Sequence, residues 1–397
     1  MKKTLDDWLD YQENLHTKTI DLGLERIGKV YKRLFPRTLN FKVITVAGTN
    51  GKGSTIALIE SIYQQANIQI AKFTSPHLLQ YNERFVVNGV QASDEQICSA
   101  FEKIEQQRKE VSLTYFEFST LAALIIFTAA DVDIVLLEVG LGGRLDSVNV
   151  VDCDMAIISN IDIDHTDYLG DTREAIALEK SGIMRKNTPC ICGDRNPPST
   201  IAQHAKKIGA LLTFTNTPYS GAIGLQGEHQ KYNATLAVAM VNSWQSVFPV
   251  SQTQLANGIQ NATLSGRFQL KTINNKTIVL DVAHNPAAVQ SLCATLNSSK
   301  QPTIAIFSAL KDKNINSMIK IIEPMINEWL LVPIHTNRAI TMQDLTKKFD
   351  LSSDIKVCED VSFAIHQALN AKQHQRIVIF GSFYIVADAL KIFDKIL

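Results

Sequence analysis

The chain of 397 residues lacks the patterns of an exported or membrane-embedded protein. Its six cysteines include no C-x-x-C pair, so reduced thiols are expected, as in the cytosol. The basic start Met-Lys-Lys resembles a signal peptide, but nearby aspartates interrupt any apolar core. The most apolar window, Leu121 to Ala130, falls well short of the roughly 20 residues that a membrane span needs. We therefore expect a cytoplasmic protein with no membrane partner.

An excess of charge of either sign is also absent, because Lys and Arg total 39 and Asp and Glu total 39. No general electrostatic attraction to nucleic acid follows, and a small-molecule partner fits better. With 45% hydrophobic residues the chain can bury substantial cores. Its length exceeds the usual range of roughly 100–200 residues per domain, so two or three domains are expected.

Apolar, β-branched segments alternate with helical patterns along the chain, which favours parallel sheets covered by helices on both faces. The expected strands are Val43–Val46, Ile68–Phe73, Ile134–Glu138, Met155–Ser159, Pro189–Cys192, Ile278–Asp281, Thr303–Phe307, Trp329–Val332 and Ile377–Phe380. A helix over Gln230–Ser243 and a polar, turn-rich segment over Asn257–Gly266 separate the two series. We predict an α/β protein with a P-loop-containing, mainly parallel domain over 1–266 and a smaller Rossmann-like α/β domain over 267–397.

The stretch 43–55 is the most informative, because an apolar strand leads directly into the glycine-rich turn Gly-Thr-Asn-Gly-Lys-Gly-Ser. Glycines allow successive N–H groups to point at phosphate oxygens, and a following helix presents its positive dipole end to the anion. The glycine between Lys52 and Ser54 departs from the strict G-x-x-x-x-G-K-[ST] pattern. ATP is the first ligand to propose, with structural punctuation as the alternative.

Further polar groups follow other expected strands, where doubly wound sheets bind their ligands. Ser54, Ser75, Glu138 and His165 offer donors that suit magnesium. Each has a plainer interpretation: Ser75 capping a turn, Glu138 pairing with Arg144, His165 as a hydrogen-bonded loop residue. Lys180 alone would be interpreted as a helix-surface lysine. Arg267 and Asp281 could contact phosphate and ribose or form an interdomain salt bridge.

Taken in order, these motifs resemble the folylpolyglutamate synthase/dihydrofolate synthase family, a branch of the Mur ligase superfamily. The resemblance runs almost end to end. It rests on the motifs at 16–26, 46–54, 74–77, 113–118, 138–146, 164–170, 179–183, 266–269 and 281–286. It implies an ATP-dependent ligase that joins L-glutamate to dihydropteroate and to reduced folates through an acyl phosphate, releasing ADP and phosphate.

The resemblance also implies roles for individual residues. The ATP site would comprise Gly48, Thr49, Asn50, Gly51, Lys52, Gly53, Ser54, Asn233, Arg267 and Asp281. Two magnesium ions would be held by Ser54, Ser75, Glu138, His165 and Lys180, the lysine being N6-carboxylated. Lys52, Lys180, His165 and His284 would be the catalytic residues. A monomer is expected.

For the pterin-bearing substrate the resemblance implies three segments of the chain and one histidine. These are Thr19, Ile20, Asp21 and Leu22, then Thr114, Tyr115, Phe116 and Glu117, then Leu145, Asp146 and Ser147, together with His77. His284 and Ser382 are candidates for the glutamate pocket. Tyr384 is less typical of the family and Ser181 stands where alanine is usual.

Two alternatives remain. A peptidoglycan-building Mur ligase would use similar machinery but typically carries a separate domain for a UDP group, and only about 47 residues precede Gly48. A non-catalytic ATP-binding switch would keep the phosphate loop but would not need Glu138, His165, Lys180 and the 281–284 segment together.

Overall fold

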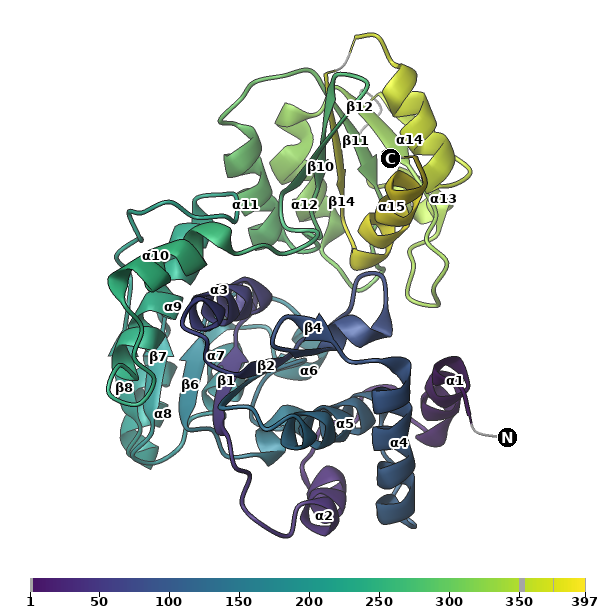
Figure 1. Cartoon of the computed structure of the whole chain (residues 1–397). Helices are drawn as coiled ribbons and strands as arrows, with labels where there is room; N and C mark the ends of the chain where they lie inside the picture. The colour runs from purple at the N-terminus through teal and green to yellow at the C-terminus, as the bar shows by residue number, and fades with distance from the viewer. Residues whose placement is uncertain (1–2, 350–353, 374, 397) are drawn as a thin grey trace. The chain divides into compact units, whose positions relative to one another are not determined.

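The computed structural model describes residues 3–349, 354–373 and 375–396. The chain divides into two compact units, one of residues 1–223 and 232–262 and the other of residues 224–231 and 263–397. Each unit contains one sheet with helices packed beside it (Figure 1). The predicted α/β class is confirmed, while a domain division at residues 266 and 267 stays a prediction.

The first unit is built on an eight-stranded sheet of order β4-β3-β2-β5-β1-β6-β7-β8. In that order the strands are Val90–Gln91, Phe85–Val87, Ile70–Phe73, Ile134–Glu138, Lys42–Ala47, Met155–Ile158, Pro189–Cys192 and Leu211–Phe214. The six neighbouring strands β2, β5, β1, β6, β7 and β8 pair in parallel. Strands β3 and β4 are added at the β2 side by antiparallel pairing. The carboxyl ends of β2, β5, β1 and β6 therefore meet at one edge of the sheet.

Ten α-helices and two short 3-10 helices of the described chain belong wholly or mainly to this unit. The α-helices are α1 (Leu5–Leu15), α2 (Glu25–Leu34), α3 (Lys52–Gln65), α4 (Asp94–Arg108), α5 (Tyr115–Ala129), α6 (Thr166–Leu169), α7 (Arg173–Ser181), α8 (Ser199–Ile208), α9 (His229–Ser243) and α10 (Gln252–Asn261). The 3-10 helices are η1 (Tyr81–Arg84) and η2 (Ser147–Val150). The prediction of a turn-rich segment over Asn257–Gly266 is wrong as far as Asn261, where α10 ends. Leu255 and Ile259 lie one helical turn apart and give α10 a buried face.

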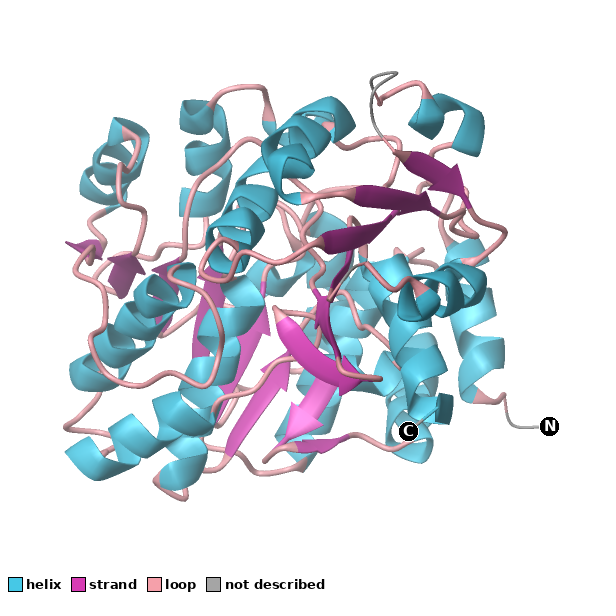
Figure 2. Ribbon diagram, turned by 90° about the horizontal axis from the view of Figure 1, so that it is seen from above, coloured by secondary structure: helices cyan, strands magenta, loops and turns pink. Residues whose placement is uncertain are grey.

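The second unit contains a six-stranded sheet of order β13-β12-β11-β14-β10-β9. Its strands, in that order, are Ile355–Val357, Glu328–Leu331, Thr303–Phe307, Arg376–Phe380, Lys276–Leu280 and Gln269–Ile273. Its helices are α11 (Pro286–Leu296), α12 (Ile315–Ile322), η3 (Glu323–Met325), α13 (Met342–Thr346), α14 (Val361–Asn370) and α15 (Phe383–Ile396). All strand pairs are parallel except β9 with β10, and Figure 2 shows the strands among their helices.

The central strands of both sheets are almost entirely buried, as expected for parallel strands covered on two faces. Every residue of β5, β11 and β14 is buried. The long apolar window near Leu121 forms the buried side of α5 and is not a membrane segment. No helix among the described residues has the length and apolar character needed to cross a bilayer.

Helix α10 packs against α3 at Gly258, where a close backbone approach requires a glycine. A Cβ atom at this position would lie 2.4 Å from the Cα atom of Ile62, and Ser61 Oγ donates a 2.7 Å hydrogen bond to the Gly258 carbonyl. Backbone atoms cannot move aside as a flexible side chain can. The two helices would have to separate to admit a methyl group.

We expect Gly258→Ala to lower the free energy of unfolding by about 2 kcal/mol, the typical cost of overpacking a close contact. Gly28→Ala is the matched control, because Gly28 also lies inside a helix but a Cβ atom added there would have no neighbouring atom within 4 Å. That control should be stabilising by up to about 1 kcal/mol through helix propensity. Urea denaturation measures both, and equal effects of the two substitutions would contradict the packing argument.

Candidate active site

The phosphate-binding loop joins the end of β1 to the start of α3 and requires glycine at two points. Gly48 has φ 153° and Gly51 has φ 85°, both unfavourable for other residues. A Cβ atom on Gly48 would lie 1.8 Å from Ser159 Oγ, and one on Gly51 would lie 2.6 Å from Asn233 Oδ1. Asn233 of α9 is thus placed against the loop. The helix begins at Lys52, so the last residues of the glycine-rich turn form its first turn.

The loop is braced by the segment that follows β6, in which sequence reasoning identified His165 but not Asn160. Thr49 N–H donates to the Asn160 carbonyl at 3.0 Å, and Asn50 N–H donates to Asn160 Oδ1 at 2.7 Å. Asp162 N–H donates to Thr49 Oγ1 at 3.0 Å. These two loop N–H groups are therefore used within the protein. The N–H groups in the first turn of a helix have no acceptor within that helix, so those of α3 are suited to bind an anion.

Lys52 lies in this first turn of α3. Its Nζ donates to the carbonyl oxygens of Gly48 at 3.0 Å and Thr49 at 3.4 Å. Ser54 is 2% exposed, so its hydroxyl is held in the same turn with little freedom. The loop therefore combines helix N–H groups, one ammonium and one hydroxyl, which is a suitable set for a polyphosphate.

Four of the residues proposed for metal binding lie at or beyond the ends of β1, β2, β5 and β6, which meet at the same sheet edge, and the fifth, Lys180, lies on α7. Glu138 ends β5 and is paired in register with Val46 of β1, directly before the phosphate loop. Its side chain is buried, and its Oε2 accepts a 3.1 Å hydrogen bond from the Ser75 N–H, which follows β2. Arg144, the alternative partner considered for Glu138, forms a 2.8 Å ion pair with Glu179.

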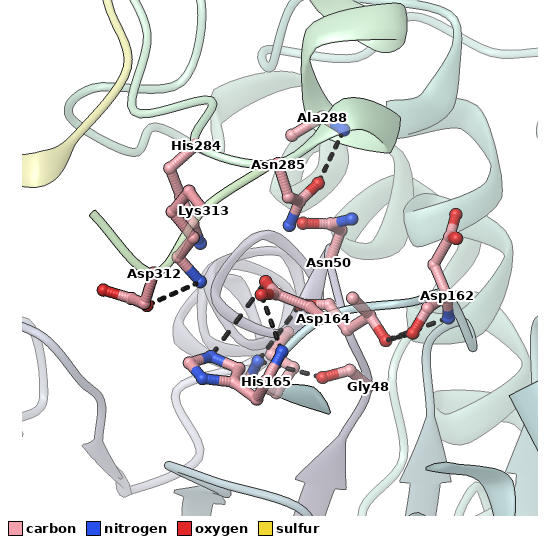
Figure 3. A network of polar contacts seen from close by, with 12 residues as sticks. Gly48, Asn50, Asp162, Asp164, His165, His284, Asn285, Ala288, Asp312 and Lys313 are labelled. Carbon is pink, nitrogen blue, oxygen red and sulfur yellow. Dashed lines mark hydrogen bonds and ion pairs between the residues drawn. The ribbon is translucent and has the colours of Figure 1, made fainter. Parts of the chain in front are cut away.

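His165 follows β6 and takes the left-handed conformation at the start of α6, with φ 53°. Its N–H donates to Asp164 Oδ1 at 2.8 Å, and its Nε2 lies 4.0 Å from Asp164 Oδ2 (Figure 3). The described residues contain no group of three or more His, Cys, Asp or Glu side chains that could hold a metal ion. One buried carboxylate with hydroxyls and an imidazole instead fits a magnesium ion that completes its coordination with phosphate oxygens and water.

Lys180 lies near the end of α7 and is buried, so its interpretation as a surface lysine is wrong. Burial, together with the smaller effect of the nearby positive charge of Lys52, lowers the pKa of its ammonium to about 7. Asp164 and Asp146 act in the opposite direction. A lysine in this environment carries a large neutral fraction at neutral pH, which is the reactive form of an amine.

The three segments proposed for the pterin-bearing substrate gather in the first unit. Arg26 Nη1 lies 2.6 Å from Asp21 Oδ2, and its Nη2 lies 3.3 Å from Glu117 Oε1. The Gly23 N–H donates to the Leu145 carbonyl at 3.1 Å. The segments 19–22, 114–117 and 145–147 are thereby brought together, although they are far apart in the sequence.

Several residues proposed for this substrate also hold the local backbone in place. Thr114 and Glu117 form the reciprocal capping box that starts α5. Asp146 accepts hydrogen bonds from the N–H groups of Leu141 at 2.8 Å and Val148 at 3.0 Å, and burial raises its pKa to about 6. Ser147 Oγ lies 2.6 Å from Thr120 Oγ1.

His77 and the aromatic residues at the start of α5 lie on the same side of the sheet. Arg84 Nε donates to His77 Nδ1 at 2.9 Å, and the Arg84 guanidinium lies 5.5 Å from the Tyr115 ring centroid. Phe116 stacks on Phe73, with ring centroids 5.6 Å apart. The half-buried aromatic faces of Tyr115 and Phe116 suit a flat heteroaromatic ring.

In the second unit, the proposed residues lie where β10 and β14 end side by side. Asp281 accepts hydrogen bonds from the N–H groups of Phe268 and Ala283, each at 2.8 Å, and burial raises its pKa. The guanidinium of Arg267 lies 5.2 Å from the Phe383 ring centroid. Because Arg267 and Asp281 belong to the same unit, the alternative of a bridge between domains is wrong.

The two candidates for a glutamate pocket are also in this unit. His284 Nδ1 donates a 2.9 Å hydrogen bond to the Val282 carbonyl oxygen. The centroids of the His284 and Phe383 rings lie 5.8 Å apart. Ser382 is buried, and its Oγ accepts a 3.3 Å hydrogen bond from the Ile385 N–H. Helix α11 begins two residues after His284 and is capped by Asn285, whose side chain accepts a 2.9 Å hydrogen bond from the Ala288 N–H (Figure 3).

Comparison with known families assigns both units. Residues 46–208 match the Mur ligase middle domain, and residues 266–383 match the Mur ligase, glutamate ligase domain. The chain is 37% identical to the dihydrofolate synthase/folylpolyglutamate synthase of Escherichia coli strain K12, over 98% of this chain and 96% of that protein.

Solved structures agree with this comparison. The structure of E. coli FolC in complex with DHPP and ADP superposes with a TM-score of 0.93 at 36% identity, covering 99% of this chain and 98% of that one. A bifunctional folylpolyglutamate synthase/dihydrofolate synthase with Mn, AMPPNP and L-glutamate bound gives a TM-score of 0.90 at 36% identity, with the same coverage of both chains. The likeness therefore extends over both units of the chain.

Proposed function

The chain belongs to the dihydrofolate synthase/folylpolyglutamate synthase family of Mur ligases, and on this premise we propose which of its residues perform the reaction. The protein is an ATP-dependent ligase that adds L-glutamate to dihydropteroate and to folates. The observation that carries this function is the 37% identity to a bifunctional relative over 98% of the chain. We infer that the folates used are reduced folates, that the protein is a monomer, and that it acts in the cytoplasm.

The chemistry requires activation, because a carboxylate is a poor acyl donor. The substrate carboxylate attacks the γ-phosphorus of ATP, the bond to ADP breaks, and an acyl phosphate forms. The α-amine of L-glutamate then attacks the carbonyl carbon and loses a proton, and phosphate leaves as the amide forms. Catalysis of these steps depends on positioning the reactants and neutralising phosphate charge.

In this proposal the N–H groups in the first turn of α3 and Lys52 bind the phosphates of ATP. Gly48, Thr49, Asn50, Gly51 and Gly53 shape the loop, and Asn233, Arg267 and Asp281 contact the nucleotide. The burial of Ser54 at the start of α3 supports its role beside the phosphates. Lys52 would neutralise the charge that develops as the γ-phosphoryl group is transferred.

We propose that Ser54, Ser75, Glu138, His165 and Lys180 hold two magnesium ions, which would neutralise phosphate charge. The neutral amine of Lys180 would react with carbon dioxide, forming an N–C bond and losing a proton, to give a carbamate. A carbamate is an oxygen ligand with negative charge, unlike the ammonium it replaces. The burial of Lys180 and its pKa of about 7 support this role, because both favour the neutral amine.

The pterin-bearing substrate is proposed to bind along the three gathered segments and His77, with Phe116 and Tyr115 offering aromatic faces. His284 and Ser382 are proposed for the glutamate pocket, and His284 is also proposed as a catalytic residue. With Nδ1 donating to the Val282 carbonyl, His284 Nε2 carries the lone pair and can accept a proton from an amine.

An activity assay tests the function. Purified protein is incubated with ATP, magnesium, labelled L-glutamate and either dihydropteroate or a reduced folate, and phosphate release and label transfer are measured. Transfer with both acceptors is expected. Transfer with neither would overturn the ligase function, and transfer with the reduced folate alone would remove the dihydrofolate synthase activity.

A further inference from the structure

Two of the three segments proposed for the pterin-bearing substrate are loops, so side-chain contacts must fix their positions. Residues 17–24 precede α2 without regular secondary structure, and residues 139–146 follow β5 in the same way. The segment 114–117 forms the cap and first turn of α5, whereas in the other two segments only Ser147 belongs to a helix, the short η2. A group that ties a loop to this helix end would therefore control the geometry of the whole site.

Arg26, in the first turn of α2, makes such a tie. Its Nη2 donates a 2.5 Å hydrogen bond to the Asp21 carbonyl, and its Nη1 lies 2.6 Å from Asp21 Oδ2. The same Nη2 lies 3.3 Å from Glu117 Oε1. One planar guanidinium thus contacts both the backbone and the carboxylate of the loop and a carboxylate of the helix end. A lysine could not reproduce this fork of donors.

The Glu117 carboxylate makes this contact consequential. Its side chain is 4% exposed, and its Oε2 already accepts a 2.8 Å hydrogen bond from the Thr114 N–H. The Oε1 atom is buried and forms no hydrogen bond among the described residues, so the Arg26 ion pair is its described electrostatic partner. Without Arg26 a buried negative charge would lose its cation at the edge of the substrate site.

A second contact holds the same loop from the other side. His16 Nε2 lies 3.2 Å from Asp21 Oδ2, and His16 Nδ1 lies 2.9 Å from Ser112 Oγ, two residues before Thr114. Asp21 is therefore held by His16 and Arg26, and each of these also contacts the region where α5 begins. The loop 19–22 is fixed relative to α5 through Asp21.

We propose that Arg26 is a positioning residue that sets the affinity for the pterin-bearing substrate by holding the loop 19–22 against the start of α5. This inference rests on the proposed function of the three segments. We infer no role for Arg26 in phosphate binding, because within the described part of the chain its hydrogen bond and ion pairs go to the loop and to α5. Loss of Arg26 should raise the KM for dihydropteroate and leave the KM values for ATP and L-glutamate unchanged.

The test compares steady-state kinetics of Arg26→Gln and Arg26→Lys with all three substrates. For Arg26→Gln we expect the KM for dihydropteroate to rise about tenfold or more, with the KM values for ATP and L-glutamate within about twofold of wild type. Arg26→Lys should recover part of this loss, because it keeps the charge but not the fork.

Arg33→Gln is the matched control. Arg33 lies two turns further along α2 and is exposed to a similar degree. It donates to the Gln107 and Arg108 carbonyls at the end of α4 and pairs with Glu110, and none of these residues belongs to a substrate segment. Its KM for dihydropteroate should remain at the wild-type value. A rise equal to that of Arg26→Gln would show a general effect of loosening α2 and would overturn the inference.

Asp21→Asn keeps the experiment decisive if Arg26→Gln does not fold, because it removes the carboxylate charge from the contact with Arg26 without leaving Glu117 unpaired. In the cycle of Asp21→Asn, Arg26→Lys and the double variant, we expect effects on the dihydropteroate KM that are clearly less than multiplicative. Strictly multiplicative effects, or an unchanged dihydropteroate KM, would overturn the inference while wild-type activity persists. Absence of wild-type transfer to dihydropteroate would instead overturn the proposed function.

Discussion

Lys180→Ala should lower kcat about a thousandfold, a loss comparable to removing one preorganised charged group from an active site. The lysine is buried near Lys52, and the alanine would remove the only group there that can become a carbamate in the proposed scheme. Added bicarbonate should not restore activity, because alanine has no amine to carboxylate. Initial rates with dihydropteroate, with and without bicarbonate, measure the effect.

Lys207→Ala is the control, because Lys207 is an exposed lysine of α8, the helix that follows α7. Its kcat should equal that of wild type. The carbamate itself is observed by ¹³C NMR after equilibration with labelled bicarbonate. One signal should be present in wild type and in Lys207→Ala and missing in Lys180→Ala. Near-normal turnover of Lys180→Ala would refute the carbamate role.

The pH dependence of this signal follows from the Lys180 pKa of about 7, lowered by burial. The neutral amine dominates above pH 7, so the carbamate signal should weaken as pH falls below about 7. The free energy of unfolding should also decrease as pH falls. A group whose folded pKa lies below its unfolded value contributes stability that is lost as pH falls from about 10.5 toward about 7. Lys180→Met should flatten that dependence in urea denaturation of the metal-free protein.

The sequence predicted the central strands well because they are continuous apolar runs. All nine expected strands are present, but β3, β4, β8, β9 and β13 were not anticipated. These five lie at or near the sheet edges, and several are very short or largely exposed, as β4 and β8 are. Their stability comes from pairing with a neighbour rather than from their own residues, and a sequence pattern does not contain that information.

The candidate site shows the same division. Glu138 and the phosphate loop could be placed from sequence, because residues at the carboxyl ends of parallel strands meet at one edge. Lys180 could not, since the sequence of a helix does not reveal which neighbour covers it. Asn160 was missed, although it comes directly after the expected strand Met155–Ser159, because an asparagine in a loop has many structural uses. The available signal was its place after a predicted parallel strand, where polar residues of neighbouring strands meet.

The second large effect is expected for Lys52→Met, which removes the ammonium of the phosphate loop while keeping an unbranched side chain. We expect kcat to fall about a thousandfold and the Kd for ATP to rise about tenfold, because charge neutralisation matters more during phosphoryl transfer than in the ground state. Initial rates and equilibrium titration with ATP measure the two effects. Loss of ATP binding with unchanged kcat at saturation would contradict a role in transfer.

Lys42→Met is the matched control, since Lys42 begins the strand whose other end leads to the phosphate loop. It is half exposed and pairs with Asp154 at 2.8 Å. Its removal should leave both kcat and the Kd for ATP near wild type. Lys52→Arg should retain most of the ATP affinity but less of kcat, because a planar guanidinium does not occupy the place of a compact ammonium.

Lys52→Met should also change Lys180, although the two residues lie on different helices. The Lys52 charge lowers the Lys180 pKa, so its removal should raise that pKa and reduce the neutral amine at pH 7. It should also withdraw a cation from a carbamate once formed. The ¹³C signal should therefore be weaker than in wild type near pH 7 and recover at higher pH, where the amine is neutral in either protein. An unchanged signal near pH 7 would mean that Lys52 acts on phosphate alone, whereas the expected loss would show that the phosphate loop and the buried lysine are electrostatically coupled.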